Sequence, residues 1–240
     1  LNNLLHGDLG ASFRYEDWSV NQLVAKALPI SAAIGGGALL IALVLGVTLG
    51  TIAALRQNSV VDYTVMLFSN LGHAFPSFVI GPVLILIFAL WLRWFPAGGW
   101  DNFAPRYMVL PMVMLVFINV ATIGRVMRGS LIEVMHGNFI RTARAKGLPT
   151  HVVVLRHALK PALLPVVSLI GPLAISSITS AVVTESVFSL PGLGKLIVNG
   201  AGNRDYTLVL GLVVLMTVVA VSFNLLVDLA YAALDPKIRY

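Results

Sequence analysis

Long, almost uncharged apolar runs dominate the chain and predict membrane-spanning helices. A helix needs about 20 mostly apolar residues to cross the roughly 30 Å hydrocarbon core of a bilayer, and five stretches are long enough. These predicted spans are residues 31–55, 66–92, 107–124, 161–184 and 207–234. His73 and Pro76 interrupt the second span. The pattern predicts an all-α polytopic membrane protein.

The composition excludes a soluble fold. Of 240 residues, 58% are hydrophobic and 11% are charged, whereas soluble domains carry about 25% charged residues. The chain has no cysteine, which excludes disulfides, thiolate metal sites and cysteine nucleophiles. Gly46 and Gly50 have the spacing at which helices approach closely, and we interpret them as packing residues.

The basic residues predict the orientation. Residues 125–160 hold seven of the sixteen Lys and Arg residues and one acid, Glu133. Short loops rich in Lys and Arg stay in the cytoplasm, so this loop and the C-terminal tail are predicted to be cytoplasmic. Residues 1–30 then form an external segment, and residues 31–240 form the transmembrane domain. A chain enters hydrocarbon as a complete helix, so we expect a sixth helix preceding residue 1.

The central cytoplasmic loop contains a predicted short helix over residues 138–147. Asn138 can cap its start, Arg141 and Arg144 lie in its later turns, and Gly147 can end it. Two interpretations compete. An amphipathic basic helix can rest on anionic lipid headgroups, or it can dock into a groove of another protein. The residues alone favour neither the lipid-bound nor the protein-bound interpretation.

Several motifs carry a family resemblance. The run from Arg141 to Gly147, followed by Leu159-Lys160-Pro161, resembles the EAA loop of binding-protein-dependent ABC importer permeases, in the form typical of peptide permeases. Arg141 and Thr142 stand where the general motif has Glu and Ala. Residues 7–12, 185–194, 203–206 and 234–240 also look like segments of this family.

The resemblance implies a type I ABC importer transmembrane domain with six helices. It implies a permease subunit that translocates oligopeptides across the bacterial inner membrane, with dipeptide, glutathione and nickel permeases as alternatives. The expected partners are a homologous second permease, an external peptide-binding protein, membrane lipid and two ATPase subunits that bind ATP and Mg. The residues expected to couple to an ATPase are Asn138, Phe139, Ile140, Arg141, Thr142, Ala143, Arg144, Ala145, Lys146 and Gly147.

The sequence predicts no catalytic, metal or cofactor site and no nucleic-acid partner. Residues 192–196 are glycine-rich but lack the spacing of a phosphate-binding loop, so ATP hydrolysis is expected on separate subunits. His151 and His157 are six residues apart and do not share a helix face. A stand-alone channel or an ion-coupled carrier is the alternative from another class, and it needs ionisable residues or broken helices inside the spans. The spans offer only His73 and Asp228.

Polar residues inside the predicted spans suggest two further features. The candidate translocation path consists of Asn119, Ser176, Ser177, Thr179 and Ser180, although such residues can equally bond to neighbouring helices. Asp228 is a charge inside a span, where an unpaired charge is costly. We expect it either to pair with Arg125 or Arg128, or to face water at a helix end.

Overall fold

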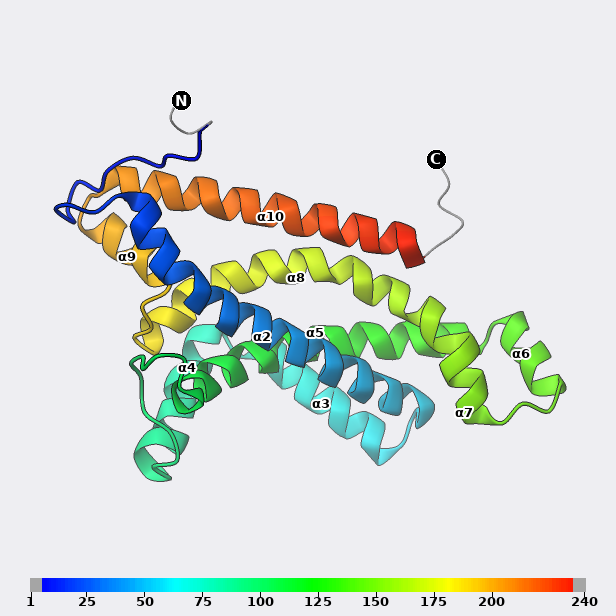
Figure 1. Ribbon diagram of the computed structural model, residues 1–240. Helices are drawn as coiled ribbons and strands as arrows, with labels where there is room; N and C mark the ends of the chain where they lie inside the picture. The colour runs from blue at the N-terminus through cyan, green and yellow to red at the C-terminus, as the bar shows by residue number, and fades with distance from the viewer. Residues whose placement is uncertain (1–5, 235–240) are drawn as a thin grey trace. The chain divides into compact units, whose positions relative to one another are not determined.

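The computed structural model describes residues 6–234, apart from the side chains of residues 73, 178–180 and 230–234. Over that range the chain is helical, and the one β-type contact is an isolated bridge between Ala11 and Ser19. The elements, labelled in Figure 1, are α2 (Val20–Leu55), α3 (Val60–Ala74), α4 (Ser77–Leu84), η1 (Ile85–Trp91), α5 (Pro105–Met135), α6 (Asn138–Ala145), α7 (Thr150–Val152), η2 (Val153–Ala158), α8 (Leu159–Val187), α9 (Leu193–Gly202) and α10 (Tyr206–Leu234). The predicted all-α class is confirmed.

Four helices in the described range are long and apolar enough to cross a membrane. They are Val20–Leu55, Pro105–Met135, Thr150–Ser177 and Tyr206–Leu229. The second predicted span is two helices, α3 and the α4–η1 segment, and it makes a fifth span if the broken pair counts as one. Pro76 causes the break, because it lies in extended backbone (φ −59°, ψ 141°) directly before α4 and a helix rarely continues through the residue before a proline.

The first span starts earlier than the sequence predicted. Helix α2 begins at Val20, so the expected boundary at residue 31 falls inside it. Ser19 and Gln22 explain the earlier start. The Ser19 backbone N–H donates to the Gln22 side chain at 3.0 Å, and the Gln22 backbone N–H donates to the Ser19 hydroxyl at 3.2 Å. This reciprocal pair is a capping box.

The helices contribute to two compact units. The first unit comprises Leu1–Leu39, Phe75–Val116 and Ala174–Ser222, and the second comprises Leu40–Ala74, Phe117–Leu173 and Phe223–Tyr240. Helices α2, α5, α8 and α10 each supply residues to both units. The core of the first unit has two apolar clusters, one around Met114 and Phe188 and one around Val20 and Leu212.

In the second unit, α2 packs against α5 through the two glycines singled out in the sequence. A Cβ at Gly46 would lie 2.7 Å from the Ile123 side chain, and a Cβ at Gly50 would lie 2.5 Å from the Gly124 carbonyl oxygen. Neither distance is tolerable for a real side chain. The interpretation of these glycines as packing residues is confirmed.

We expect Gly50→Ala to destabilise the protein by about 1–3 kcal/mol, because the added methyl group meets backbone that cannot move aside. Thermal unfolding of the detergent-solubilised chain measures this effect. Gly36→Ala on the same helix is the matched control, since its Cβ would meet nothing within 4 Å. Equal midpoints for the two variants would contradict the close approach of α2 and α5.

Candidate functional site

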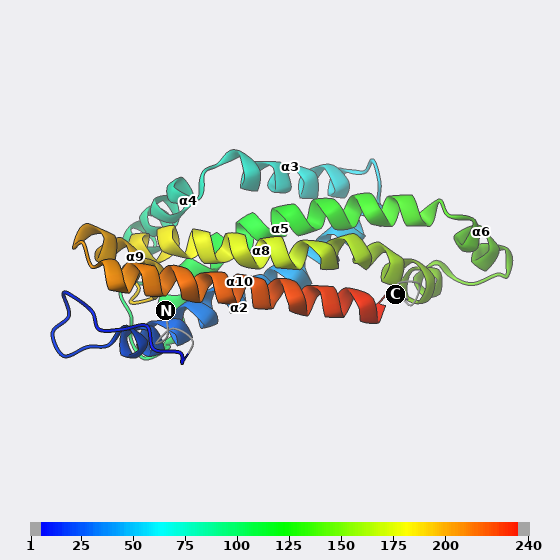
Figure 2. The same ribbon diagram turned by 90° about the horizontal axis from the view of Figure 1, so that it is seen from above.

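Helix α6 confirms the short helix predicted in the central loop. It spans Asn138–Ala145, and in both views it lies beyond the ends of α2 and α3 (Figures 1 and 2). Gly137, with extended backbone, takes the capping position that the sequence assigned to Asn138. Asn138 is instead the first helical residue, and its carbonyl oxygen accepts a hydrogen bond from the Thr142 hydroxyl at 3.1 Å.

The two faces of α6 have different surroundings. Ile140 is fully buried and Ala143 is nearly so, and α6 contacts η2, whose Val153, Val154 and Ala158 are also buried. Phe139 remains 52% exposed. The other exposed residues of the segment are Asn138, Arg141, Thr142, Arg144, Ala145, Lys146 and Gly147. The apolar face of the helix is therefore satisfied within the chain, and the outward face is cationic with one aromatic ring.

Gly147 ends the helix as the sequence predicted. Its φ of +78° lies in the left-handed region, which residues with a Cβ rarely adopt. Its N–H donates to the Arg144 carbonyl oxygen at 2.9 Å, and the Lys146 N–H donates to the Thr142 carbonyl oxygen at 3.1 Å. The ten candidate residues 138–147 thus form one continuous helix and its stop.

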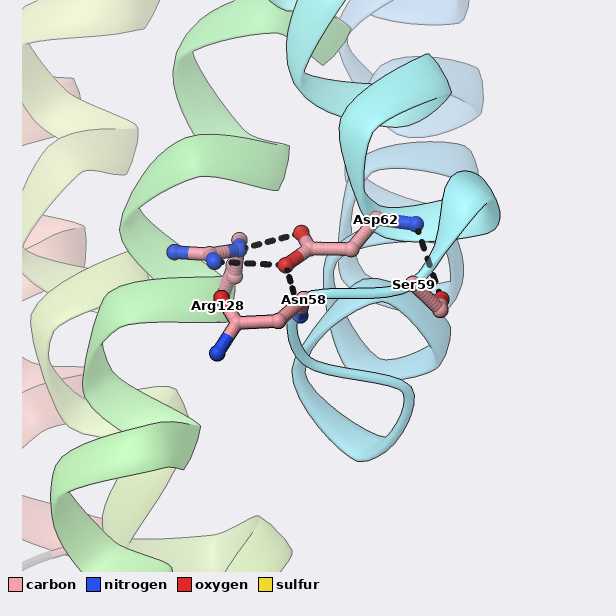
Figure 3. A network of polar contacts seen from close by, with 4 residues as sticks. All are labelled: Asn58, Ser59, Asp62 and Arg128. Carbon is pink, nitrogen blue, oxygen red and sulfur yellow. Dashed lines mark hydrogen bonds and ion pairs between the residues drawn. The ribbon is translucent and has the colours of Figure 1, made fainter.

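The arginines near the end of α5 have partners that the sequence did not predict. Arg128 binds Asp62 of α3 through two hydrogen bonds, from Nε to Oδ1 at 2.5 Å and from Nη2 to Oδ2 at 2.6 Å (Figure 3). Arg125 donates to the Asn70 side-chain oxygen at 3.0 Å. Asp228 is exposed, and no ion pair joins it to another residue in the described part of the chain.

The predicted pairing of Asp228 with Arg125 or Arg128 is therefore wrong for these residues. The two parallel bonds fix the guanidinium of Arg128 on Asp62. Asp62 also lies in the first turn of α3, where the helix dipole favours a negative charge. Asp228 is exposed on α10, and the alternative that it faces water stays a prediction.

The candidate path residues lie in different environments. Asn119 and Ser177 are buried, whereas Ser176 is exposed. The side chains of Thr179 and Ser180 lie outside the described residues. Two other polar residues in the spans bond to their own helix, since the hydroxyl of Thr122 donates to the Ile118 carbonyl oxygen and that of Ser168 to Leu164. Burial of Asn119 and Ser177 favours packing over a wet path at those two positions.

Glu185 is a buried acid whose role the sequence did not reveal. Its side chain is 1% exposed, yet it accepts hydrogen bonds from the Ser31 hydroxyl at 2.5 Å and from the backbone N–H groups of Gly194 at 2.7 Å and Lys195 at 3.1 Å. The carboxylate thus satisfies the first turn of α9 and joins it to α2 and α8. No group of three or more His, Asp or Glu side chains in the described range could hold a metal ion.

Asp205 joins the N-terminal segment to the start of α10 in the same way. It is fully buried and caps α10 by accepting the Leu208 N–H at 3.2 Å. It also accepts the Ser12 hydroxyl and the Phe13 N–H. Figure 1 shows the N-terminal segment beside α9 and the start of α10, where these bonds form. An Asp directly before a long apolar run is the sequence signal that could have identified it.

The same contacts set the charge state of Asp205. Burial alone would raise the pKa of this carboxyl, but hydrogen bonds from Ser12 and from the backbone of Leu208, Phe13 and Arg14 together hold its pKa below the ordinary value. The ionised carboxylate therefore stabilises the folded state at pH values above the unfolded pKa of about 3.9. This contribution is lost as the pH falls through the lower folded pKa.

We expect the backbone amides of Phe13 and Leu208 to lose protection from hydrogen exchange as the pH falls below about 4, after correction for the intrinsic exchange rate. In Asp205→Asn that pH dependence should disappear, because residue 205 then has no carboxyl group to titrate. Asp101→Asn changes an exposed acid and should keep the wild-type profile. A pH-independent wild-type profile would refute the stabilising role of the carboxylate.

The chain matches a described protein family over most of its length. Residues 46–240 match the family described as "Binding-protein-dependent transport system inner membrane component". The oligopeptide transport system permease protein OppB of Haemophilus influenzae is 56% identical over 240 residues, which is all of this chain and 78% of the relative. OppB of Escherichia coli K12 is 55% identical with the same coverage. The dipeptide transport system permease protein DppB of Bacillus subtilis is 39% identical over 239 residues, with 100% of this chain and 77% of the relative covered.

Solved structures support the fold. A chain of the MetNI methionine ABC transporter, in an inward-facing conformation, superposes with a TM-score of 0.75 at 17% identity and covers 89% of this chain and 97% of that one. A chain of an amino acid ABC transporter gives a TM-score of 0.63 at 16% identity, with coverage of 89% and 94%. The predicted fold of an ABC importer permease is confirmed. The chain belongs to the family of inner membrane components of binding-protein-dependent transport systems.

Proposed function

We propose that the chain is the permease subunit of an ATP-driven importer of oligopeptides, and that α6 is the segment that docks on an ATPase subunit. Relatives named as oligopeptide permeases are 54–56% identical, whereas a relative named as a dipeptide permease is 39% identical. This difference favours oligopeptides over dipeptides. No comparable observation supports glutathione or nickel as the substrate, or an ion-coupled carrier.

The arrangement of α6 carries the docking proposal. An amphipathic helix that rests on lipid has to turn its apolar face toward the acyl chains. In α6 that face is already buried, since Ile140 and Ala143 are shielded within the chain. The exposed Phe139 and the surrounding cations fit a protein groove, where an aromatic ring can fill a pocket and guanidinium groups can bind carboxylates.

The proposed complex contains the partners that the sequence motifs imply. These are a homologous second permease, an external peptide-binding protein and two ATPase subunits that bind ATP and Mg. Transport follows alternating access, because ATP-driven closure of the ATPases favours one conformation of the permeases over the other. Residues 125–160 and the C-terminus are then cytoplasmic, although residues 235–240 lie outside the described range. The N-terminal segment and α9 face the external binding protein.

The path that the peptide takes through the chain is also part of this proposal. Asn119, Ser176, Ser177, Thr179 and Ser180 are its candidate residues. Ser176, which is exposed, is the best placed of the three whose side chains are described.

We expect Phe139→Asp to reduce co-purification of the ATPase subunits at least tenfold and to reduce ATP-dependent peptide uptake with it. A buried aromatic anchor is worth about 2 kcal/mol or more at an interface, and its replacement by Asp adds an unpaired charge. Because Phe139 is exposed in this chain, the variant should still fold. Affinity pull-down from membranes measures the bound ATPase.

Phe13→Asp serves as the matched control, since Phe13 is also exposed but belongs to the N-terminal segment. It should retain the ATPase subunits in full. Wild-type recovery of the ATPases by Phe139→Asp would overturn the docking role of α6, and ATP-independent uptake by this chain alone would overturn the proposed function.

A further inference from the structure

The Asp62–Arg128 pair joins α3 to α5 through two parallel hydrogen bonds. Figure 3 shows the guanidinium of Arg128 facing the carboxylate of Asp62, with both oxygens engaged. The Asp62 side chain is 1% exposed and that of Arg128 is 24% exposed. A two-pronged Arg–carboxylate contact fixes orientation as well as distance, so a displacement of one helix at this point is imposed on the other.

The same carboxylate also fixes the turn between α2 and α3. Its Oδ2 accepts the backbone N–H of Asn58 at 2.9 Å, and the backbone N–H of Asp62 donates to the Ser59 hydroxyl at 3.4 Å (Figure 3). Asn58 has a left-handed φ of +61°. The end of α2, the start of α3 and α5 therefore meet at one acidic side chain.

Arg128 also lies on the helix that leads to α6. Helix α5 continues without a break from Arg128 to Met135, a length of about 10 Å, and α6 begins at Asn138 after a short turn. A continuous helix transmits displacement along its axis because each turn is hydrogen-bonded to the next. Movement of α6 is therefore delivered to the guanidinium of Arg128.

Apolar packing between α3 and its neighbours is interrupted. A pocket of about 390 Å³ lies between residues 64–69 of α3, α5 and α2. It is lined by Leu49, Thr64, Val65, Phe68, Ser69, Phe117, Val120, Ala121 and Gly124. Beyond the cavity, α3 regains contact through the Arg125–Asn70 bond and through Gly72, which lies close to Ala121. Atoms across a void make no van der Waals contact.

We infer that the Asp62–Arg128 ion pair couples α3 to the movement of α6 and α5, so that both residues are positioning residues for transport. This inference depends on the proposed docking of α6 on an ATPase. Without the pair, α5 can still follow the ATPase, but the nearby end of α3 does not follow α5. ATP hydrolysis then continues while the spans fail to change state together.

The test uses the whole transporter and a neutral double variant. Asp62→Asn/Arg128→Gln removes the ion pair without leaving one buried charge alone, which single substitutions would do. We expect normal assembly and ATP hydrolysis, but at least a tenfold drop in labelled penta-alanine imported per ATP hydrolysed. The matched control is Asp101→Asn/Arg106→Gln, which removes an exposed pair at 3.5 Å and should keep the wild-type ratio.

A second measurement reports the movement itself. The chain has no cysteine, so labels can be placed at Leu67→Cys on α3 and Glu133→Cys on α5, both exposed. With the ion pair intact, the distance between these labels should stay the same with and without ATP. In the double variant it should change or broaden between the two states. A merely stabilising contact would not produce that nucleotide-dependent difference.

A conservative variant covers the case in which the double variant does not assemble. Arg128→Lys keeps the charge but loses the two-pronged bond, and it should lower the peptide-to-ATP ratio, whereas Arg106→Lys, at an exposed arginine, should not. An unchanged ratio, or a fall in assembly with the ratio preserved, would overturn the inference. Absence of ATPases or of import in the wild-type complex would instead refute the proposed function, and the two failures are therefore distinguishable.

Discussion

A buried polar group has to find its partner within protein, because the water that would otherwise bond to it is excluded. Three acids are buried in the described part of the chain, Asp62, Glu185 and Asp205. Each bonds to a residue far away in sequence, namely Arg128, Ser31 and Ser12, at separations of 66, 154 and 193 residues. Helices in a bilayer gain little from hydrophobic attraction to one another. The few acids of this chain therefore determine which helix ends are held together.

This constraint also explains the form of α6. The chain buries Ile140 and Ala143 against its own structure, so the helix is held in place before any partner arrives. Its position at the end of the unbroken α5 connects it to Arg128 and, through Asp62, to α3 and the turn after α2. A preformed helix loses little conformational freedom on binding. The same packing that orders α6 ties it to the helices that the proposed mechanism has to move.

Features that depend on the local sequence pattern were predictable, whereas contacts that depend on how the helices pack were not. The spans, α6 and its stop at Gly147 were predictable, because bilayer thickness and glycine backbone preferences leave little freedom. The early start of α2 was readable in the Ser19–Gln22 capping box but was masked by Lys26 and Pro29, which interrupt the apolar run of residues 20–30. The partner of Arg128 was not readable. Asp62 and Asp228 are both acids near predicted helix ends, and only the packing of α3 on α5 decides between them.

The buried acids also bear on how peptides would be selected. A path that discriminates among peptides by their side chains needs fixed polar or charged groups that are free to bond with those side chains. In the described residues, each buried carboxylate is instead occupied by bonds within the chain: Asp62 by Arg128, Glu185 by Ser31 and α9, and Asp205 by Ser12 and α10. Breaking those bonds to bind a peptide would leave backbone N–H groups or a guanidinium unsatisfied. Under the proposed function, discrimination among peptides therefore falls to the external binding protein, and this chain supplies a passage whose buried carboxylates are committed to holding its helices.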